Sequence, residues 1–415
     1  MALTLKTITF NHDPGSALTS AMNIRRNKDF EVLVPEYDSA APRPTTESCA
    51  AYSIADTAGQ NVFVRVTFTI SAPANTTYQV RASGGGVLGK LGSIAATFTG
   101  GTTCTVDILL NHRSFKAVGL HDVSWQWQYK HGGGWHNLVT TSHRVYVLLS
   151  IPNAPWTQTF ADKRNPWTDL LDECCVKAAG ARTATTAAKR MVAAIYGSYS
   201  LRYDIVSGAP RYGFAVTGGS FALTNWINYV LRGNAPVNPK FCGGSAEEYR
   251  NFLIVNCYDA AASLALMAKV IGAPLDYYFD QPFGYLNYVE PIGRGKCNNP
   301  FYGCQGGLPE VGPDDARTSF GNHAYTKLLA ANNFDACMKE WLPALTKILL
   351  FLLWLIILII TLGIINAESL LDRANGWLVD LTQAIYDQRT TDISQPFEAA
   401  AAGGAPAVQV LQFQV

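Results

Sequence analysis

The sequence predicts a multidomain protein: a β-sandwich over residues 1–155, an α+β domain over residues 156–340 and a single transmembrane helix over residues 346–366. Three observations predict this fold class. Apolar and polar residues alternate along short segments of the first third of the chain, helical periodicity begins only after a proline-containing boundary, and one long segment carries no charge. A length of 415 residues suits two or three domains. Residues 367–415 are expected to form a C-terminal helix and tail.

The composition excludes some classes of function. Lys and Arg number 32 against 31 Asp and Glu, so the net charge of +1 creates no field that would attract nucleic acid, and no nucleic-acid partner is expected. Charged residues make up 15% of the chain, against roughly 25% in ordinary soluble domains, which favours contact with a membrane. Nine cysteines are too few for a disulfide scaffold and odd in number, so at least one thiol stays unpaired, as in a reducing compartment. The N-terminal segment lacks the apolar core of a signal peptide.

The first domain is predicted to be an antiparallel, immunoglobulin-like (Ig-like) sandwich. Along Asn61–Ile70 the apolar residues fall at every second position, which is the pattern of a half-buried strand. Shorter segments of the same kind follow at Tyr78–Ala82, Ile94–Phe98, Val106–Leu110, Val123–Tyr129 and Arg144–Leu149. Glycine triplets between them mark turns, and short strands spaced in this way are typical of such sandwiches. Trp125 and Trp127 share one strand face, where core packing is favoured over a sugar-binding platform.

The second domain begins after Ile151–Trp156, where two prolines end the strand pattern. Capping residues and apolar periodicity then predict helices over Trp167–Ala179, over Thr183–Tyr196, from Ser245, and from near Asp259 to a C-terminal Gly272. Beyond that glycine, short strands alternate with loops rich in Gly, Pro and Asn. This order of elements indicates an α+β domain.

The segment Ile348–Ile365 is predicted to span a membrane. It contains 18 residues without a charge, and a helix of that length measures about 27 Å, close to the thickness of the hydrocarbon layer of a bilayer. A fully buried helix is the alternative, but such helices usually keep a polar stripe, and this segment has none. Lys339 and Lys347 precede the span, so the positive-inside rule places the preceding domain on the cytoplasmic side of a single-pass membrane protein.

Three residues of the second domain are candidates for nucleophilic catalysis. Cys257 lies just ahead of the alanine-rich helix, whose N-terminus would favour a thiolate and offer backbone N–H groups to an oxyanion. His323 is the only histidine beyond residue 150, so it is the only imidazole of this domain that could serve as a base. Asp335 follows twelve residues later, and a hairpin through Ala330–Asn333 would bring it opposite His323 to orient the imidazole.

These residues carry a resemblance to a known family. The sequence Asn-Cys257-Tyr-Asp-Ala on a helix, followed by Gly-Asn-His323-Ala-Tyr and Phe-Asp335-Ala-Cys on strands, resembles the transglutaminase-like (papain-like, papain-related) cysteine superfamily. The resemblance covers roughly residues 196–339 and implies an α+β fold with the three residues on a helix and two adjacent strands. It also implies Cys257 as the nucleophile, His323 as the general base and acid, and Asp335 as the residue that orients the imidazole.

The function implied by the resemblance is that of a membrane-tethered cysteine hydrolase or acyltransferase acting on amides of a protein or peptide substrate. The thiolate attacks the carbonyl, an acyl-thioester forms, and water or an amine resolves it. Family members include cross-linking enzymes, proteases, deamidases and inactive proteins. Two alternatives stay open: a non-enzymatic membrane-inserting toxin, and a membrane-anchored interaction protein with an inactive transglutaminase-like fold. No cofactor and no metal are expected, and the sequence does not predict the oligomeric state.

Other cysteines and histidines are interpreted as structural. Cys297 and Cys304 are predicted to be loop thiols rather than metal ligands, because no second ligand pair lies nearby in the sequence. Cys337 shares the strand face of Asp335, so it is expected near the site without a role. The segment His131–His136 contains glycines between its histidines, and it is interpreted as a hairpin tip rather than a metal site.

Overall fold

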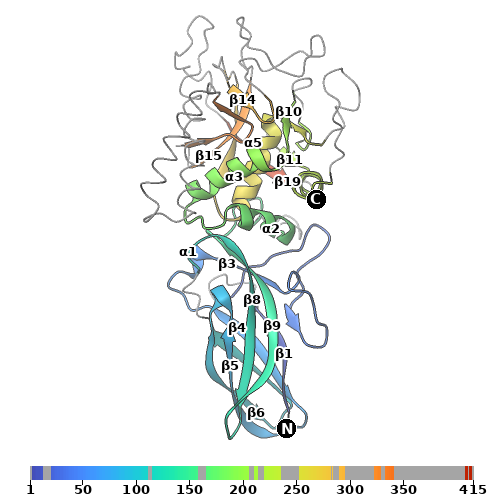
Figure 1. The fold of residues 1–415 in the computed structure, drawn as a ribbon, viewed down its shortest axis with the longest axis vertical. Coiled ribbons are helices and arrows are strands. Elements are labelled where there is room, and N and C mark those ends of the chain that lie inside the picture. Colours follow the sequence, from blue (N-terminus) through green and yellow to red (C-terminus); the bar gives the residue numbers. More distant parts are fainter. Residues whose placement is uncertain are drawn as a thin grey trace, which may run out of the picture. The chain divides into compact units, whose positions relative to one another are not determined.

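The computed structural model of the chain consists mostly of strands, with few helices (Figure 1). It describes residues 2–12, 20–110, 115–157, 165–204, 210–213, 219–234, 252–281, 283, 289–294, 322–328, 332–340, 407–409 and 411–413. The chain divides into two compact units, Met1–Arg182 with Val270–Gly272 and Thr183–Lys269 with Ala273–Val415. The predicted catalytic residues all belong to the second unit.

The first unit contains two sheets, with the strand orders β2-β1-β4-β7 and β3-β9-β8-β5-β6. The strands of the first sheet are β1 (Leu3–Thr9), β2 (Tyr37–Asp38), β4 (Phe63–Ile70) and β7 (Thr103–Leu109). Those of the second sheet are β3 (Cys49–Ser53), β5 (Asn75–Gly84), β6 (Leu91–Thr99), β8 (Gly119–Lys130) and β9 (Trp135–Leu148). Two short helices, α1 (Ile54–Thr57) and the 3₁₀ turn η1 (Gly86–Leu88), connect strands.

The core of the first unit lies between its two sheets. In β4, Val64 and Val66 are buried while Arg65 between them is exposed, as the alternation predicts. Trp125 and Trp127 of β8 join the same core, and their rings lie 5.8 Å apart in an edge-to-face arrangement. Both indoles are buried, so they pack the core and do not form a sugar-binding platform.

The strand β3 departs from the prediction. It pairs with β9 in parallel, so the two-sheet unit is not purely antiparallel. All five residues of β3 are buried, which leaves no alternation of polar and apolar residues by which the strand could be recognised. The long hairpin of β8 and β9 is prominent in Figure 1, and its closing pair is Lys130 and Trp135, so the segment His131–His136 spans a hairpin tip as predicted.

The helix α2 (Thr168–Lys177) belongs to the first unit, which continues to Arg182, past the two prolines where the sequence places a boundary. Two residues of β9 hold the helix. The guanidinium of Arg144 and the hydroxyl of Tyr146 donate to Asp172 Oδ1 at 3.1 and 2.7 Å. These cross-element hydrogen bonds cannot be inferred from local periodicity, which marks only the helix itself.

The second unit combines helices with short sheets. Its helices are α3 (Ala184–Ser198), α4 (Leu223–Trp226), which continues as the π-helical turn η3 (Ile227–Leu231), and α5 (Cys257–Val270). Its largest sheet has the order β16-β15-β13-β18, and three strand pairs accompany it: β10-β12, β11-β19 and β14-β17. The strands are β10 (Arg202–Tyr203), β11 (Gly219–Phe221), β12 (Ile254–Val255), β13 (Leu275–Asp280), β14 (Val289–Pro291), β15 (His323–Leu328), β16 (Asn332–Phe334), β17 (Met338–Glu340), β18 (Ala407–Gln409) and β19 (Leu411–Phe413).

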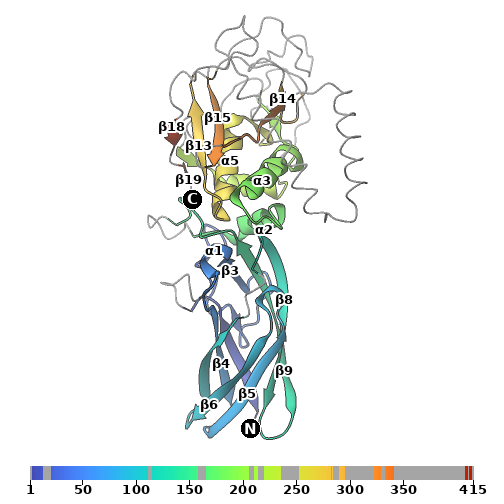
Figure 2. The same ribbon diagram turned by 90° about the vertical axis from the view of Figure 1, so that its left-hand side faces the viewer.

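The helix α5 is the buried element of the second unit. Figure 2 shows it next to the antiparallel strands β13 and β15. Ala260, Leu264 and Met267 are fully buried, as their helical spacing predicts, and a helix that is apolar on nearly all sides must be buried in this way. Gly272, with a φ of +80°, adopts the left-handed conformation that follows the helix end.

The predicted transmembrane helix is not supported, and the fold class is corrected accordingly. Within the described ranges, no helix is both long and apolar enough to cross a membrane. The longest of these helices, α3, has 15 residues and measures about 22 Å, against a hydrocarbon layer of roughly 30 Å. The proposed span Ile348–Ile365 and the helix predicted from Ser245 lie outside the described residues, as does the helix predicted after residue 367. The fold is therefore mostly β with few helices.

Candidate active site

Cys257 is the first residue of α5. The helix begins here because Asn256 caps it: Oδ1 of Asn256 accepts the N–H groups of Tyr258 and Asp259 at 3.1 and 3.3 Å. Asp259 completes a reciprocal cap, since its Oδ2 accepts the N–H of Asn256 at 3.4 Å. The sequence placed the helix start near Asp259, and the cap moves it back to Cys257. The thiol therefore lies in the first turn, at the positive end of the helix dipole.

His323 opens β15, and Asp335 directly follows the end of β16. In this sheet Thr326 pairs with Phe334, so the register does not set His323 directly opposite Asp335 as the predicted hairpin would. The side chains meet all the same, with Nε2 of His323 2.7 Å from Oδ2 of Asp335. Both side chains are buried, so water does not compete for this hydrogen bond.

The neighbours of His323 determine its charge. Burial by itself lowers the pKa of an imidazole, but Asp335 and Cys257 act in the opposite direction through their negative charges and hydrogen bonds. The result is a pKa of His323 raised to about 10. Cys257 thus lies within electrostatic reach of the imidazole, and the structure brings the three predicted residues together. Asp335 engages Nε2 of His323, so Nδ1 is the ring nitrogen that the carboxylate does not contact.

Cys337 contributes to the site more than the sequence suggested. Its backbone N–H donates to Oδ1 of Asp335 at 2.8 Å, so the carboxylate is held by this amide on one oxygen and by His323 on the other. Burial, followed by the charges of Asp335 and Cys257, raises the pKa of the Cys337 thiol well above its ordinary value. One ligand atom each from His323, Asp335 and Cys337 lies within 4.8 Å of the others.

Aromatic side chains enclose the imidazole. The ring centroid of Phe283 lies 4.7 Å from that of His323, and Tyr325 stacks at 6.3 Å on the same strand. The hydroxyl of Tyr258 donates to Oδ1 of Asn322, which connects the first turn of α5 to the residue before His323. Sequence reasoning did not identify these residues. Only Tyr325 carries a signal that could have revealed it, since it lies two positions after His323 and therefore on the same strand face.

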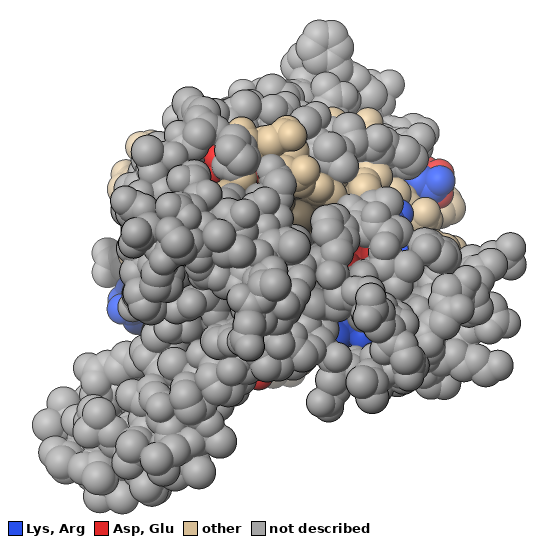
Figure 3. All heavy atoms as spheres, turned by 90° about the horizontal axis from the view of Figure 1, so that it is seen from above, with Lys and Arg blue, Asp and Glu red and all other residues tan. Residues whose placement is uncertain are grey.

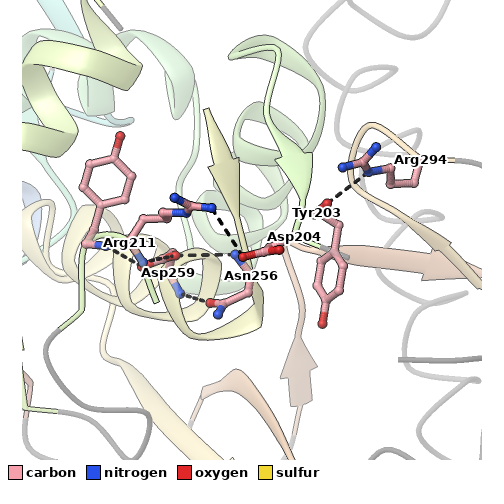
Figure 4. Close-up of polar contacts among 7 residues, drawn as sticks. Tyr203, Asp204, Arg211, Asn256, Asp259 and Arg294 are labelled. Carbon is pink, nitrogen blue, oxygen red and sulfur yellow. Dashed lines mark hydrogen bonds and ion pairs between the residues drawn. The ribbon is translucent and has the colours of Figure 1, made fainter. Parts of the chain in front are cut away.

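Asp259 anchors a loop against the first turn of α5 (Figure 4). Its carboxylate accepts the backbone N–H groups of Arg211, Tyr212 and Gly213 at 2.8, 2.8 and 3.2 Å. The guanidinium of Arg211 lies 3.5 Å from the carboxylate of Asp204 and closes the cluster. Burial raises the pKa of Asp259 to about 6, although the backbone N–H groups act to lower it. The segment 210–213 is therefore coupled to the helix that carries the thiol.

Figure 3 views the molecule from above, and most of the atoms on this face belong to residues that the structure does not describe. The visible side chains of described residues are mostly neither basic nor acidic, and the few charged ones are of both signs.

Comparison with known proteins assigns no family to this geometry. No protein-family model and no curated protein matches the chain. Membership of the transglutaminase-like superfamily therefore stays a prediction, and it depends on Cys257, His323 and Asp335. Cys297 and Cys304, predicted to be loop thiols, lie outside the described residues.

Proposed function

We propose that the second unit is a cysteine-nucleophile hydrolase or acyltransferase that acts on amides of protein or peptide substrates. The observation that supports this proposal most strongly is the buried pair of His323 and Asp335, 2.7 Å apart, with Cys257 in electrostatic reach of the same imidazole. In this function Cys257 is the nucleophile, His323 is the general base and acid, and Asp335 orients the imidazole and stabilises its cation.

Because the pKa of His323 is raised to about 10, the reaction begins from an ion pair in which the imidazole already holds the thiol proton of Cys257. The sulfur then bonds to the amide carbonyl carbon, and the imidazolium returns its proton to the amine as the carbon–nitrogen bond breaks. An acyl-thioester on Cys257 remains. Water, or an amine of a second substrate, attacks this thioester while His323 takes up the proton of the attacking group, and the thiol is regenerated. Asp335 does not take up a proton in this sequence. Its carboxylate stabilises the imidazolium at each stage where His323 carries two protons.

A backbone amide of α5 is the proposed donor to the oxyanion. The N–H groups of Tyr258 and Asp259 already donate to Asn256, so the role falls to the N–H of Cys257, beside the attacking sulfur. Asn256 acts indirectly, because its cap holds the first turn of the helix in place.

The proposal is tested by native alkylation of the full chain with iodoacetamide at pH 6, in the presence of a chelator and a non-thiol reductant. Cys257 should react at least about tenfold faster than Cys337, because an imidazolium stabilises its thiolate. His323→Ala should lower the rate at Cys257 by about 10²-fold or more, the usual size of a lost proton-transfer partner. Peptide mass spectrometry after quenching measures the rate at each cysteine.

The matched control is His143→Gln, which changes another buried histidine, one that lies in the first unit. It should leave the rate at Cys257 unchanged. An activated ester should also leave an acyl adduct on Cys257, detectable as an intact-mass increase that Cys257→Ala abolishes. If Cys257 reacts no faster than Cys337 and His323→Ala has no effect, the catalytic assignment is wrong, and the interaction-protein alternative takes its place.

A further inference from the structure

Three potential metal ligands converge in the buried part of the second unit. His323, Asp335 and Cys337 each offer one ligand atom within 4.8 Å of the other two, and Cys257 does not belong to this group. The backbone supports this arrangement, because the N–H of Cys337 is hydrogen-bonded to Asp335 and holds the two residues together. The set therefore comprises one thiol, one imidazole and one carboxylate.

The chemistry of this set selects one class of cation. Thiolate and imidazole ligands with one carboxylate suit zinc and similar thiophilic ions, whereas calcium and magnesium require mainly oxygen ligands. A tetrahedral zinc site with normal bond lengths places its ligand atoms about 3.3–3.8 Å apart. The distance of 2.7 Å between His323 and Asp335 would have to widen by about 0.6 Å, and the largest separation of 4.8 Å in the group would have to contract by about 1 Å. Side-chain rotation can supply shifts of this size without a change of fold.

A thiol that coordinates zinc gives up its proton, so binding at Cys337 releases that proton to solvent. The step needs no oxidant or reductant.

We propose that His323, Asp335 and Cys337 form a binding site for one zinc ion, with solvent in the remaining position. Because the ion occupies the imidazole, His323 cannot exchange a proton with Cys257, and the catalytic site is switched off. This regulatory consequence rests on the function proposed above, whereas zinc binding itself does not. The sequence predicted no role for Cys337. In this proposal Cys337 binds the metal ion but takes no part in the catalytic reaction.

The test uses the full chain, reduced with a phosphine and freed of metal, and titrates Zn²⁺ against a chromophoric chelator. One equivalent should bind. Cys337→Ser should weaken zinc binding by about 100-fold or more. Loss of a residue that only supports a metal ligand already costs about 10- to 100-fold in affinity, and Cys337 is itself a ligand in this proposal. The same variant should keep fast alkylation of Cys257 in the presence of chelator, since Cys337 is neither nucleophile nor base. Cys49→Ser, a change at a buried thiol of the first unit, is the matched control and should bind zinc as the unaltered chain does.

Two further measurements keep the proposal falsifiable if a variant fails to fold. Co²⁺ bound to the unaltered chain should give a charge-transfer band from the thiolate of Cys337. Excess Zn²⁺ should slow alkylation of Cys257 at least about tenfold, because the ion occupies the imidazole that stabilises its thiolate. The absence of stoichiometric binding, or binding that neither Cys337→Ser nor His323→Ala weakens, overturns the proposal. Slow alkylation of Cys257 even in chelator would instead count against the proposed function and leave the zinc site standing.

Discussion

Among the residues that the structure describes, each unit buries one histidine, and the pKa values of the two are shifted in opposite directions. His143 in the first unit and His323 in the second are 0% and 1% exposed. Burial lowers the pKa of His143 to about 3, whereas the pKa of His323 is raised to about 10. The difference lies in the partners. Nδ1 of His143 is 2.7 Å from the hydroxyl of Ser48, and its Nε2 is 2.9 Å from that of Thr141.

Burial alone therefore does not make a histidine chemically useful. A hydroxyl can donate to or accept from an imidazole, so Ser48 and Thr141 satisfy a neutral ring that acts as part of the core. A carboxylate can only accept, and its charge favours the imidazolium, so Asp335 prepares His323 to hold and transfer a proton. The same residue type thus serves packing in one unit and candidate chemistry in the other.

The largest expected effect follows from removal of the carboxylate. In Asp335→Asn, the pKa of His323 should fall from about 10 to below 6.5, toward the state of His143, because an amide does not offset the cost of burying the cation. Titration of the imidazole C–H resonances by NMR in metal-free buffer measures this shift. The His143 resonance in the same spectra is the internal reference and should not move. A pKa of His323 that stays above 8 in this variant would mean that Asp335 is not what charges it.

The two histidines should also destabilise the fold at opposite ends of the pH scale. The raised pKa of His323 stabilises the folded state fully below about 6.5, and this contribution is lost as the pH rises through about 10. The lowered pKa of His143 stabilises the folded state above about 6.5, and this contribution is lost as the pH falls through about 3. Each contribution amounts to at most about 5 kcal/mol.

Denaturant unfolding of the full chain across the pH range separates these contributions. His143→Gln should flatten the decrease in the free energy of unfolding on the acid side and leave the alkaline side as it is. His323→Gln should do the reverse. An acid-side decrease that survives in His143→Gln would assign the acid sensitivity to other groups.

Buried carboxylates, one in each unit, behave alike and give a smaller effect than the histidines. Glu36 in the first unit and Asp259 in the second both accept backbone N–H groups, and burial raises their pKa values to about 7 and about 6. For Asp259, the stability gained by holding the proton is fully present below about 4 and lost as the pH rises through about 6, an effect of at most about 3 kcal/mol. Asp259→Asn should remove this slope of the free energy of unfolding between pH 4 and pH 6.5. Glu36→Gln is the control and should leave the slope due to Asp259 in place.

The site illustrates how far sequence reasoning reaches. Local patterns predict the helix start beside Cys257 and the proximity of His323 and Asp335, because a helix start and a hairpin are encoded by neighbouring residues. That the thiol joins this pair in one site was implied by the family resemblance. The details differ: Asn256 caps the helix earlier than predicted, and the strand register brings Asp335 to His323 from beyond the strand end. Differences of one or two positions such as these depend on turn geometry, which the pattern of apolar residues does not determine.

Longer-range features could not be predicted. The carboxylate of Asp259 accepts the N–H groups of Arg211 and Tyr212, which precede it by 48 and 47 residues. No rule of sequence spacing predicts hydrogen bonds over such separations. The strand β3 lacks alternation because it is buried along its whole length. The membrane span predicted from the composition of Ile348–Ile365 is not supported, because no described helix is long and apolar enough for one, and the run itself lies outside the described residues.

The smallest expected effect comes from an ion pair that is exposed to solvent, whereas His323 and Asp335 are buried. Arg65 and Asp107 face each other across β4 and β7 through two hydrogen bonds of 2.8 and 2.9 Å, and both side chains are more than 40% exposed. Water and side-chain entropy offset most of this attraction, so a double-mutant cycle with Arg65→Ala and Asp107→Ala should give a coupling below about 1 kcal/mol. Raising NaCl from 50 mM to 1 M should weaken that coupling, because the Debye length falls to about 3 Å at 1 M, while the pKa of His323 should stay nearly constant. If the exposed pair instead contributes more than 2 kcal/mol and resists salt, then burial is not what separates the two pairs, and the charged state of His323 would need another cause.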